Sequence, residues 1–337
     1  MNMLSTTALT ADVSQVANPI IEDDFDFASI SSSALLVYVS VSSWAGKIEA
    51  KTVSEEVSQQ HNAENGVTQT FKKLFGKRDK HLFAIQQHIT ATRTLFKKST
   101  LPWSDNGQRL VTTKAYFNLM KEMTGMRDKF WELVEDFLVE YNNKIIDMQA
   151  RMGSLFNIDE YPTVDELRKY YGFKLEDTPL MPVGDWRLDI NSDALKSAKD
   201  RYAQMYSDKV EAAMLDIWKR LYEPLANMSE RLDYEDTGET EEYYTKPTAA
   251  NPNGVLRTRK KGVKVFGGNL VSNITDMVDV LRVSNVTNSP RMNDMADRLE
   301  NALLGVTVES LREDEHQRKQ AKADIDAAIA ALPTLDI

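Results

Sequence analysis

Two long stretches of the chain place an apolar residue at every third or fourth position, and this pattern restricts the fold more than any other. The first covers about residues 112–152 and the second about residues 192–232. Such spacing puts the apolar side chains on one side of an α-helix, so each stretch predicts a helix of about 40 residues, about 60 Å long. A helix buries its apolar stripe only against another element, which favours an antiparallel pair. The alternative is two separate helices that cross at a steep angle.

The two seams are similar in length and composition. The first consists of Phe117, Met120, Phe130, Val134, Phe137, Leu138, Tyr141, Ile145 and Met148, and the second of Tyr202, Tyr206, Val210, Met214, Ile217, Leu221, Leu225, Met228 and Leu232. Because such a seam suits an internal pair and an intermolecular pair equally, it leaves a homo-oligomer open.

These patterns predict a mainly α fold: a long antiparallel helical hairpin or bundle with a small irregular αβ junction and a C-terminal helical unit. The expected organisation is a mobile acidic arm at 1–33, a helical unit with a short strand and a basic helix at 34–110, the hairpin at 111–232 with its junction at 153–191, a charged flexible loop or hairpin at 233–268, and the C-terminal helical unit at 269–337.

Local signals refine this outline. The apolar run at 34–41 indicates a short buried strand or the first turns of a helix, and it is too short to span a bilayer. Thr163 with Glu166 forms a capping box, so we expect a two-turn helix from 164 to 171 that stops at Gly172. Pro290 and Gly305 have the positions typical of a helix start and stop, and a last helix is expected at about 308–332. The tyrosines at 243–244 and the VKVF run at 263–266 fit the two strands of a hairpin.

Composition and motifs exclude several kinds of chemistry. The chain contains no cysteine, so thiolate sites are absent. It contains only four histidines, which leaves few ligands for a histidine-based metal centre. No phosphate-binding glycine loop, dinucleotide fingerprint or nucleophile elbow occurs. His81 and His88 lie on one helix face, but two ligands do not make a stable zinc site. We therefore expect no catalytic residue, no cofactor and no metal, and a protein that is not an enzyme.

The basic residues are the best lead toward a function. Between residues 70 and 100 eight basic side chains accompany one acidic side chain, although the whole chain has a net charge of −10. Three interpretations remain: phosphate contacts with stacking by Phe71, Phe75 and Phe96, a dock for an acidic protein, or a solvated face over core phenylalanines. A second cluster lies on an expected loop. The candidate macromolecule-binding residues are Lys72, Lys73, Lys77, Arg78, Lys80, Arg93, Lys97 and Lys98, with Arg257, Arg259, Lys260 and Lys261 in the second cluster.

A third group of residues belongs to the irregular segments and is expected to have a structural role. Charged and large apolar side chains alternate around Trp186, where an ion pair that holds the junction together is favoured over catalysis. The expected junction residues are Trp103, Tyr161, Pro162, Gly172, Asp185, Trp186, Arg187 and Asp189.

Several of these motifs, taken in order, resemble an uncharacterised phage and plasmid protein family known only as a domain of unknown function. The resemblance covers about residues 35–332 and rests on SWAGK at 43–47, TLPW at 100–103, YPT at 161–163, YGF at 171–173, VGDWRLD at 183–189 and RVSNVT at 282–287. Members of that family are often encoded near a MoxR-type AAA+ ATPase and a protein with a von Willebrand A-type domain. The resemblance therefore implies a partner in a remodelling or chaperone-like module, and it transfers no active residue.

Taken together, the sequence favours a non-enzymatic phage-type interaction or adaptor protein whose partner is an AAA+ ATPase, a von Willebrand A-type protein or both. The alternatives are a nucleic-acid-binding protein that uses the basic residues at 72–98, and a virion or scaffold component. Neither a secretory leader nor a membrane-spanning run is expected, so the expected location is the cytoplasm, that of the bacterial host if the gene is a phage gene.

Overall fold

The structure is a computed structural model that describes residues 27–76, 79–180, 193–235, 238–248, 251–260, 262–264 and 267–335. It divides into two compact units, Phe27–Lys209 and a second that contains Val210–Ile337, here called the N-terminal unit and the C-terminal unit. Helix α6, Asp193–Leu232, begins in the first unit and continues into the second. Each unit is described by itself.

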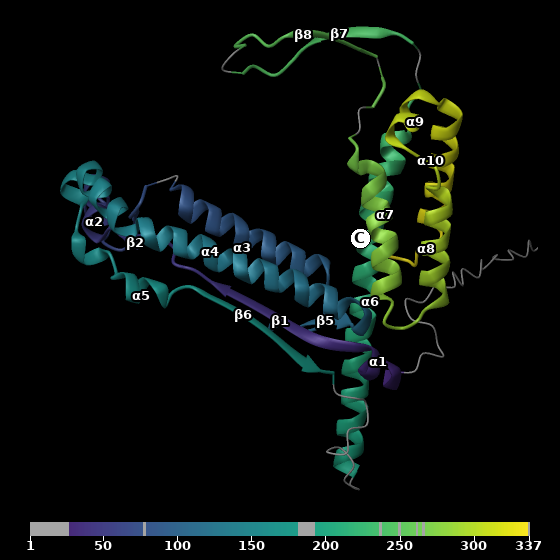
Figure 1. The fold of residues 1–337 in the computed structure, drawn as a ribbon, viewed down its shortest axis with the longest axis horizontal. Coiled ribbons are helices and arrows are strands. Elements are labelled where there is room, and N and C mark those ends of the chain that lie inside the picture. Colours follow the sequence, from purple (N-terminus) through teal and green to yellow (C-terminus); the bar gives the residue numbers. More distant parts are fainter. Residues whose placement is uncertain are drawn as a thin grey trace, which may run out of the picture. The chain divides into compact units, whose positions relative to one another are not determined.

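The N-terminal unit is built on a four-stranded antiparallel sheet in the order β4-β5-β1-β6 (Figure 1). Its strands are β1 (Ala34–Ser42), β4 (Leu101–Pro102), β5 (Arg109–Thr112) and β6 (Gly172–Pro179), and the short helix α1 (Phe27–Ser33) precedes β1. The nine-residue strand β1 pairs with β5 over its first half and with β6 over eight residues, from Leu35 opposite Pro179 to Ser42 opposite Gly172.

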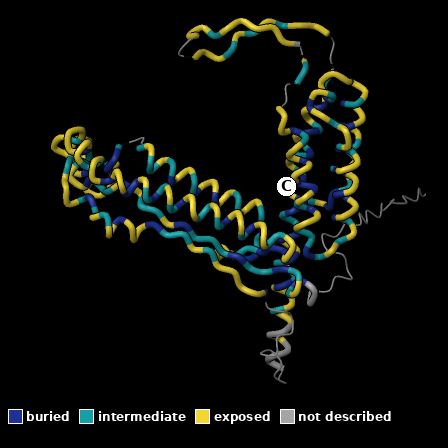
Figure 2. Tube along the Cα trace, in the orientation of Figure 1, coloured by how far each residue is buried: buried dark blue, intermediate teal, exposed yellow. Residues whose placement is uncertain are grey.

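Two helices cover this sheet. Helices α3 (Lys80–Lys98) and α4 (Thr113–Met152) run antiparallel to each other, and both contact β1 (Figure 1). The buried stripe of α4 packs in a core with Phe75, Leu74 and residues of α3, and the aromatic rings there meet edge to face, with 5.8 Å between the centroids of Phe75 and Phe137. The buried positions follow the α3–α4 interface and the sheet-facing sides of these helices (Figure 2).

A smaller assembly lies beside the end of this core. Strands β2 (Lys47–Glu49) and β3 (Phe71–Lys73) form a two-stranded antiparallel sheet, and α2 (Lys51–Gln60) follows β2. Hydroxyl groups hold α2 to the following loop, since the Thr70 backbone N–H donates to Ser54 Oγ at 2.8 Å. The 3-10 turns at Gly153–Leu155 and Ile158–Glu160 and the helix α5 (Val164–Arg168) then connect α4 to β6.

The C-terminal unit is mostly helical. The part of α6 after Val210 is accompanied by α7 (Asn269–Ser284), α8 (Pro290–Ala302), α9 (Val308–Glu313) and α10 (Glu315–Ala330). Ser229 of α6 donates a hydrogen bond to Asp326 of α10, and Arg282 of α7 pairs with Asp297 of α8 at 2.7 Å. A two-stranded hairpin, β7 (Thr240–Tyr244) with β8 (Leu256–Lys260), lies between α6 and α7 in the chain.

The expectation of a mainly α fold is wrong, because an antiparallel sheet forms the base of the N-terminal unit. Helices still dominate, with 61% of residues in helix and 14% in strand. The expected irregular junction contains β6, which pairs with β1 along eight residues and supplies the backbone partners that a strand of this length requires.

The expected hairpin of two long helices is also wrong, although both helices exist with nearly the predicted bounds. Helix α4 buries its stripe against α3, β1 and β6, all within the N-terminal unit. The seam of α6 is buried from Tyr206 to Leu232, and its part after Val210 belongs to the C-terminal unit. The two apolar stripes are therefore buried by different elements. The spacing of apolar residues shows that a stripe is buried, but it does not reveal which element covers it.

Several local predictions are confirmed. The run at 34–41 is a strand, Thr163 and Glu166 form the capping box of α5, and Pro290 is the first residue of α8. The last predicted helix is instead two, because Asp314 ends α9 and caps α10 by accepting the Gln317 backbone N–H at 3.0 Å. The predicted hairpin exists, but its second strand is 256–260 rather than 263–266. Among the described helices, none has an apolar stretch of the length that crossing a bilayer requires.

Candidate functional site

Helix α3 carries four of the basic residues singled out in the sequence, Lys80, Arg93, Lys97 and Lys98, and a side-chain cap fixes its start. Asp79 caps its start, because Oδ1 accepts the backbone N–H groups of His81 and Leu82, each at 3.0 Å. The side turned to the core is formed by Ile85, Ile89, Thr92 and Phe96. The opposite side of the helix faces solvent, so α3 presents a single outward face over 19 residues.

The basic residues at the start of α3 are only partly available to a ligand. Lys72 is half-buried, pairs with Glu160 and donates to the Leu155 carbonyl at 2.8 Å, so its charge is already engaged. Lys73 on β3 and Lys80 at the first turn of α3 are exposed. Lys77 and Arg78 lie outside the described residues.

The remaining basic residues of α3 lie toward its other end. Arg93 donates to the Val41 carbonyl at 3.2 Å, and Lys97 and Lys98 are exposed in the last turn. Cations there complement the negative end of the helix dipole. A 19-residue helix is about 27 Å long, so the two groups of basic residues lie near opposite ends of α3 and do not form one patch.

The interleaved phenylalanines divide between core and surface. Phe75 and Phe96 are buried, as the core interpretation expects. Phe71 is 49% exposed, and the Lys47 ammonium lies over its ring, 5.1 Å from the centroid. Only Phe71 among the three is therefore placed to stack on a ligand.

The outward face of α3 has a feature that sequence reasoning missed. From Phe83 to Phe96 the helix contains one charged residue, Arg93, which bonds to β1. Phe83 is 60% exposed on this face. A shallow pocket of about 710 Å³ lies along it, and its lining residues are Phe83, Gln86, Gln87, Thr90, Ala91, Thr94, Leu95 and Lys98. The signal in the sequence was the long interval with a single charge between Lys80 and Lys97, on a helix whose other side already supplies the core stripe.

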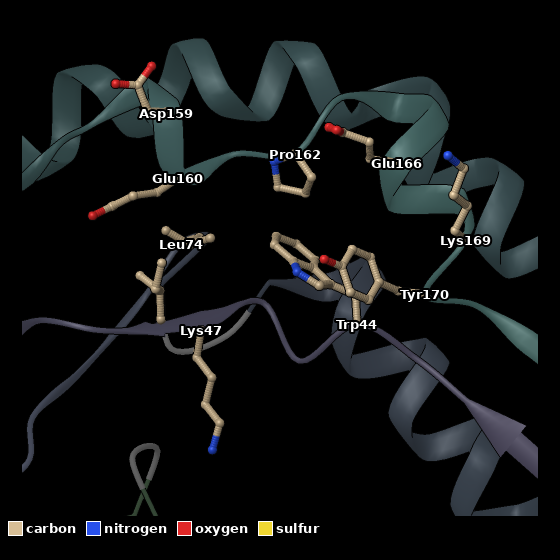
Figure 3. Close-up of a pocket in the computed structure, with 10 residues that line it drawn as sticks. Trp44, Lys47, Leu74, Asp159, Glu160, Pro162, Glu166, Lys169 and Tyr170 are labelled. Carbon is tan, nitrogen blue, oxygen red and sulfur yellow. The ribbon is translucent and has the colours of Figure 1, made fainter.

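A second pocket, of about 560 Å³, opens beside Trp44 where β2, Leu74 and α5 meet (Figure 3). Tyr170 and Pro162 also line it, and the charged side chains of its wall have mixed signs, with Lys47 and Lys169 against Asp159, Glu160 and Glu166. Two of these carboxylates are engaged, since Glu160 pairs with Lys72 and Glu166 accepts the Thr163 backbone N–H at 2.9 Å. The lining thus indicates no single class of ligand.

The expected junction residues that the structure describes have structural contacts. The Tyr161 hydroxyl donates to the Leu74 carbonyl at 2.9 Å, and the Tyr141 hydroxyl donates to the Pro162 carbonyl at 2.9 Å. Trp103 packs edge to face on Tyr206, with 5.3 Å between the centroids, and Gly172 begins β6. Asp185, Trp186, Arg187 and Asp189 lie outside the described residues.

The second basic cluster lies on the hairpin of the C-terminal unit. Arg259 pairs with Glu241 on the opposite strand at 2.6 Å, and its guanidinium lies 4.8 Å from the ring centroid of Tyr243. Arg257 is exposed on the same strand, and Lys260 is the last residue of β8. Lys261 lies outside the described residues.

The histidines of α3 take part in packing contacts. His88 Nε2 lies 2.8 Å from the Met126 carbonyl of α4, and burial together with the nearby Lys144 charge lowers the pKa of His81. Within the described parts of the chain, no three side chains of the types His, Cys, Asp or Glu gather in a way that would hold a metal ion.

Comparison with known proteins adds no relative. The chain matches no protein-family model, no curated protein and no solved structure. The resemblance to the phage and plasmid family therefore stays a prediction from the motifs.

Proposed function

We propose that the protein is a non-enzymatic interaction or adaptor protein that binds an amphipathic, acidic-ended helix of a partner protein on the outward face of α3. The observation that carries this proposal is the nearly uncharged, solvent-facing surface between Lys80 and Lys97, with Phe83 60% exposed at one end. As the sequence suggested, basic residues would attract a negatively charged partner. The proposed contact itself is the nearly uncharged face between Lys80 and Lys97.

The chemistry of this face favours a helix as the bound element. A solvated helix face normally carries charged residues, and large exposed apolar side chains with small neighbours mark contact surfaces. Ala91, Thr90 and Thr94 are small enough to let another backbone approach, and Phe83 offers an anchor for a pocket in the partner. Gln87 offers an amide for hydrogen bonding beside them, whereas Gln86 already donates to Ser43 Oγ at 2.8 Å.

The ends of the face favour a partner with negative charge. Lys80 stands at the start of α3 and Lys97 in its last turn, about 25 Å apart along the axis. Acidic residues at both ends of a docked helix would be attracted to them, which steers association and fixes the register. The MoxR-type AAA+ ATPase and the von Willebrand A-type protein implied by the motif resemblance are the first partners to test.

The test compares substitutions of two exposed phenylalanines, both of which lie in the N-terminal unit. Binding of the full chain to each purified partner is measured with Phe83→Asp and with the control Phe117→Asp, whose side chain is 77% exposed on α4. Phe83→Asp should weaken binding at least tenfold and leave the thermal midpoint unchanged, whereas Phe117→Asp should change neither. Lys80→Glu with Lys97→Glu should slow association most strongly at low salt.

Two results would contradict this function. One is equal loss of binding in both phenylalanine variants, which would mean that the α3 face is not the contact. The other is a salt-sensitive gel shift with nucleic acid that Lys73→Glu and Lys80→Glu abolish, because phosphate binding through those residues is the competing function.

A further inference from the structure

The hairpin of the C-terminal unit separates its charges between its two strands. Glu241 and Glu242 lie on β7, and Arg257 and Arg259 lie on β8. In the antiparallel register Glu241 is opposite Arg259 and Tyr243 is opposite Arg257. One long side of the hairpin is therefore acidic and the other basic, and the ion pair of Arg259 with Glu241 joins the two strands.

In the part of the hairpin that the structure describes, both faces are largely exposed, although Glu241 and Tyr243 are half-buried. Residues 256–259 of β8 are all exposed, and Tyr244, at the end of β7 nearest the turn, is 68% exposed. Tyr244 lies opposite Leu256, which is 46% exposed, so the strand ends next to the connecting loop carry apolar surface in water. A two-stranded hairpin without a buried face is marginally stable, and both of its outer edges offer unpaired backbone N–H and C=O groups.

We propose that a second copy of this chain pairs with the hairpin edge to edge, with β7 of one copy antiparallel to β8 of the next. Pairing β7 with β7 would place glutamates next to glutamates, and pairing β8 with β8 would place arginines next to arginines, both of which are unfavourable. Acidic-to-basic pairing repeats between copies the Glu241–Arg259 contact that already exists within one hairpin. Charge on an edge strand usually prevents self-pairing, but opposite charges on the two edges select this arrangement.

The geometry makes the assembly head-to-tail. Each hairpin has one acidic edge and one basic edge, so every copy can hold two neighbours in one continuous antiparallel sheet. The Tyr244–Leu256 pairs of successive copies then lie side by side and become partly buried. The copies form a closed ring or an open chain according to the rotation between neighbours. This inference concerns a different unit from the proposed α3 dock and does not depend on it.

Charge exchange tests the arrangement in the full-length protein. Sedimentation of the wild type should show concentration-dependent oligomers that dissociate as salt rises. The variants E241R/E242R and R257E/R259E should each remain monomeric, because one makes both edges basic and the other makes both acidic. Mixing these two variants in equal amounts should restore assembly.

A fourfold exchange, E241R/E242R/R257E/R259E, guards against misfolding of the hairpin. It inverts both edges but retains the acid–base pairing within the hairpin, so it should assemble with itself as well as the wild type does. A wild type that is monomeric at every concentration, an E241R/E242R variant that assembles like the wild type, or a fourfold variant that stays monomeric would each overturn the proposal.

Discussion

The carboxylate of Asp79 caps α3 with one oxygen and pairs with the Lys144 ammonium of α4 through the other. Both side chains are largely buried, with 10% and 16% of their surfaces exposed. One side chain thereby fixes the start of one helix and joins it to a second helix 65 residues further along the chain.

Replacing Asp79 by Ala should be strongly destabilising, because it removes the cap and leaves Lys144 without its partner in a desolvated place. We expect the free energy of unfolding to fall by about 3–5 kcal/mol. Asp79→Asn retains a cap acceptor and should cost less than Asp79→Ala. The control is Glu135→Ala, which breaks an exposed pair with Arg168 and should cost less than about 1 kcal/mol. Urea titration measures all three, and equal losses for Asp79→Ala and Glu135→Ala would contradict the cap and the pair as the cause.

The same pair should make the stability of the protein depend on acid pH. Burial alone would raise the pKa of Asp79, but the hydrogen bond from Lys144 and the backbone N–H groups of Leu82 and His81 together lower it below its ordinary value of 3.8. The stabilisation is therefore complete above that value and is lost as the pH falls through the lower pKa of the folded state. The difference in free energy of unfolding between wild type and Asp79→Asn should shrink below about pH 4. A difference that stays constant down to about pH 2 would exclude this linkage.

Gly46 should accept a side chain only at a cost in stability. Its φ is +61°, and a Cβ atom would lie 2.8 Å from Cδ1 of Leu82 on α3. Gly46→Ala should lower the free energy of unfolding by about 2–3 kcal/mol through backbone strain and overpacking. Gly66 is the matched control, since its φ is +94° but a Cβ atom there would have no neighbour within 4 Å. Gly66→Ala should cost only the backbone strain, and a cost equal to that of Gly46→Ala would show that Leu82 does not restrict the site.

Arg318 of α10 is a buried cation whose replacement should stabilise the C-terminal unit. Its side chain is 1% exposed, its guanidinium lies 4.1 Å from the ring centroid of Tyr234, and its Nε and Nη2 atoms have no hydrogen-bond partner among the described residues. Arg318 makes one hydrogen bond, from Nη1 to the Leu311 carbonyl at 3.4 Å. Methionine has a similar volume and brings no unpaired polar atom of its own, so Arg318→Met should raise the free energy of unfolding by about 1 kcal/mol despite the loss of that long bond. Calorimetry of the full chain tests this, with Arg312→Met on α9 as the comparison. A lower midpoint for Arg318→Met would mean that the ring contact outweighs the unpaired groups.

The helices could be predicted from the sequence because their signals are local. The bounds of α4 and α6 follow from apolar spacing, and α5 from the capping box of Thr163 and Glu166. Strand β6 could not be predicted in this way, since its sequence GFKLEDTP is half polar and its outer residues are exposed. Strand β6 forms because it pairs with β1. The available clue was that a nine-residue strand such as β1 needs partners for its backbone N–H and C=O groups.

The candidate site was predicted only in part for a similar reason. Charge counting pointed to α3, but it could not show that Lys72 would be engaged by Glu160 across 88 residues of sequence. Charge counting also directed attention to the lysines. The exposed apolar surface of α3 is instead formed by Phe83 and the nearly uncharged face beside it. Which side of a helix faces solvent becomes known only when its packing partners are known.

The hydroxyl groups of Tyr141 and Tyr161 donate to the main-chain carbonyls of Pro162 and Leu74, and the Tyr161 hydroxyl also lies 3.4 Å from Met152 Sδ. A carbonyl is present whatever amino acid occupies the acceptor position. In diverging descendants of this gene, positions 74 and 162 are thus free to change under packing constraints alone, while the two phenols have no substitute that reaches the same oxygens. Selection would therefore preserve the two tyrosines, whereas the residues that supply the carbonyl groups could change.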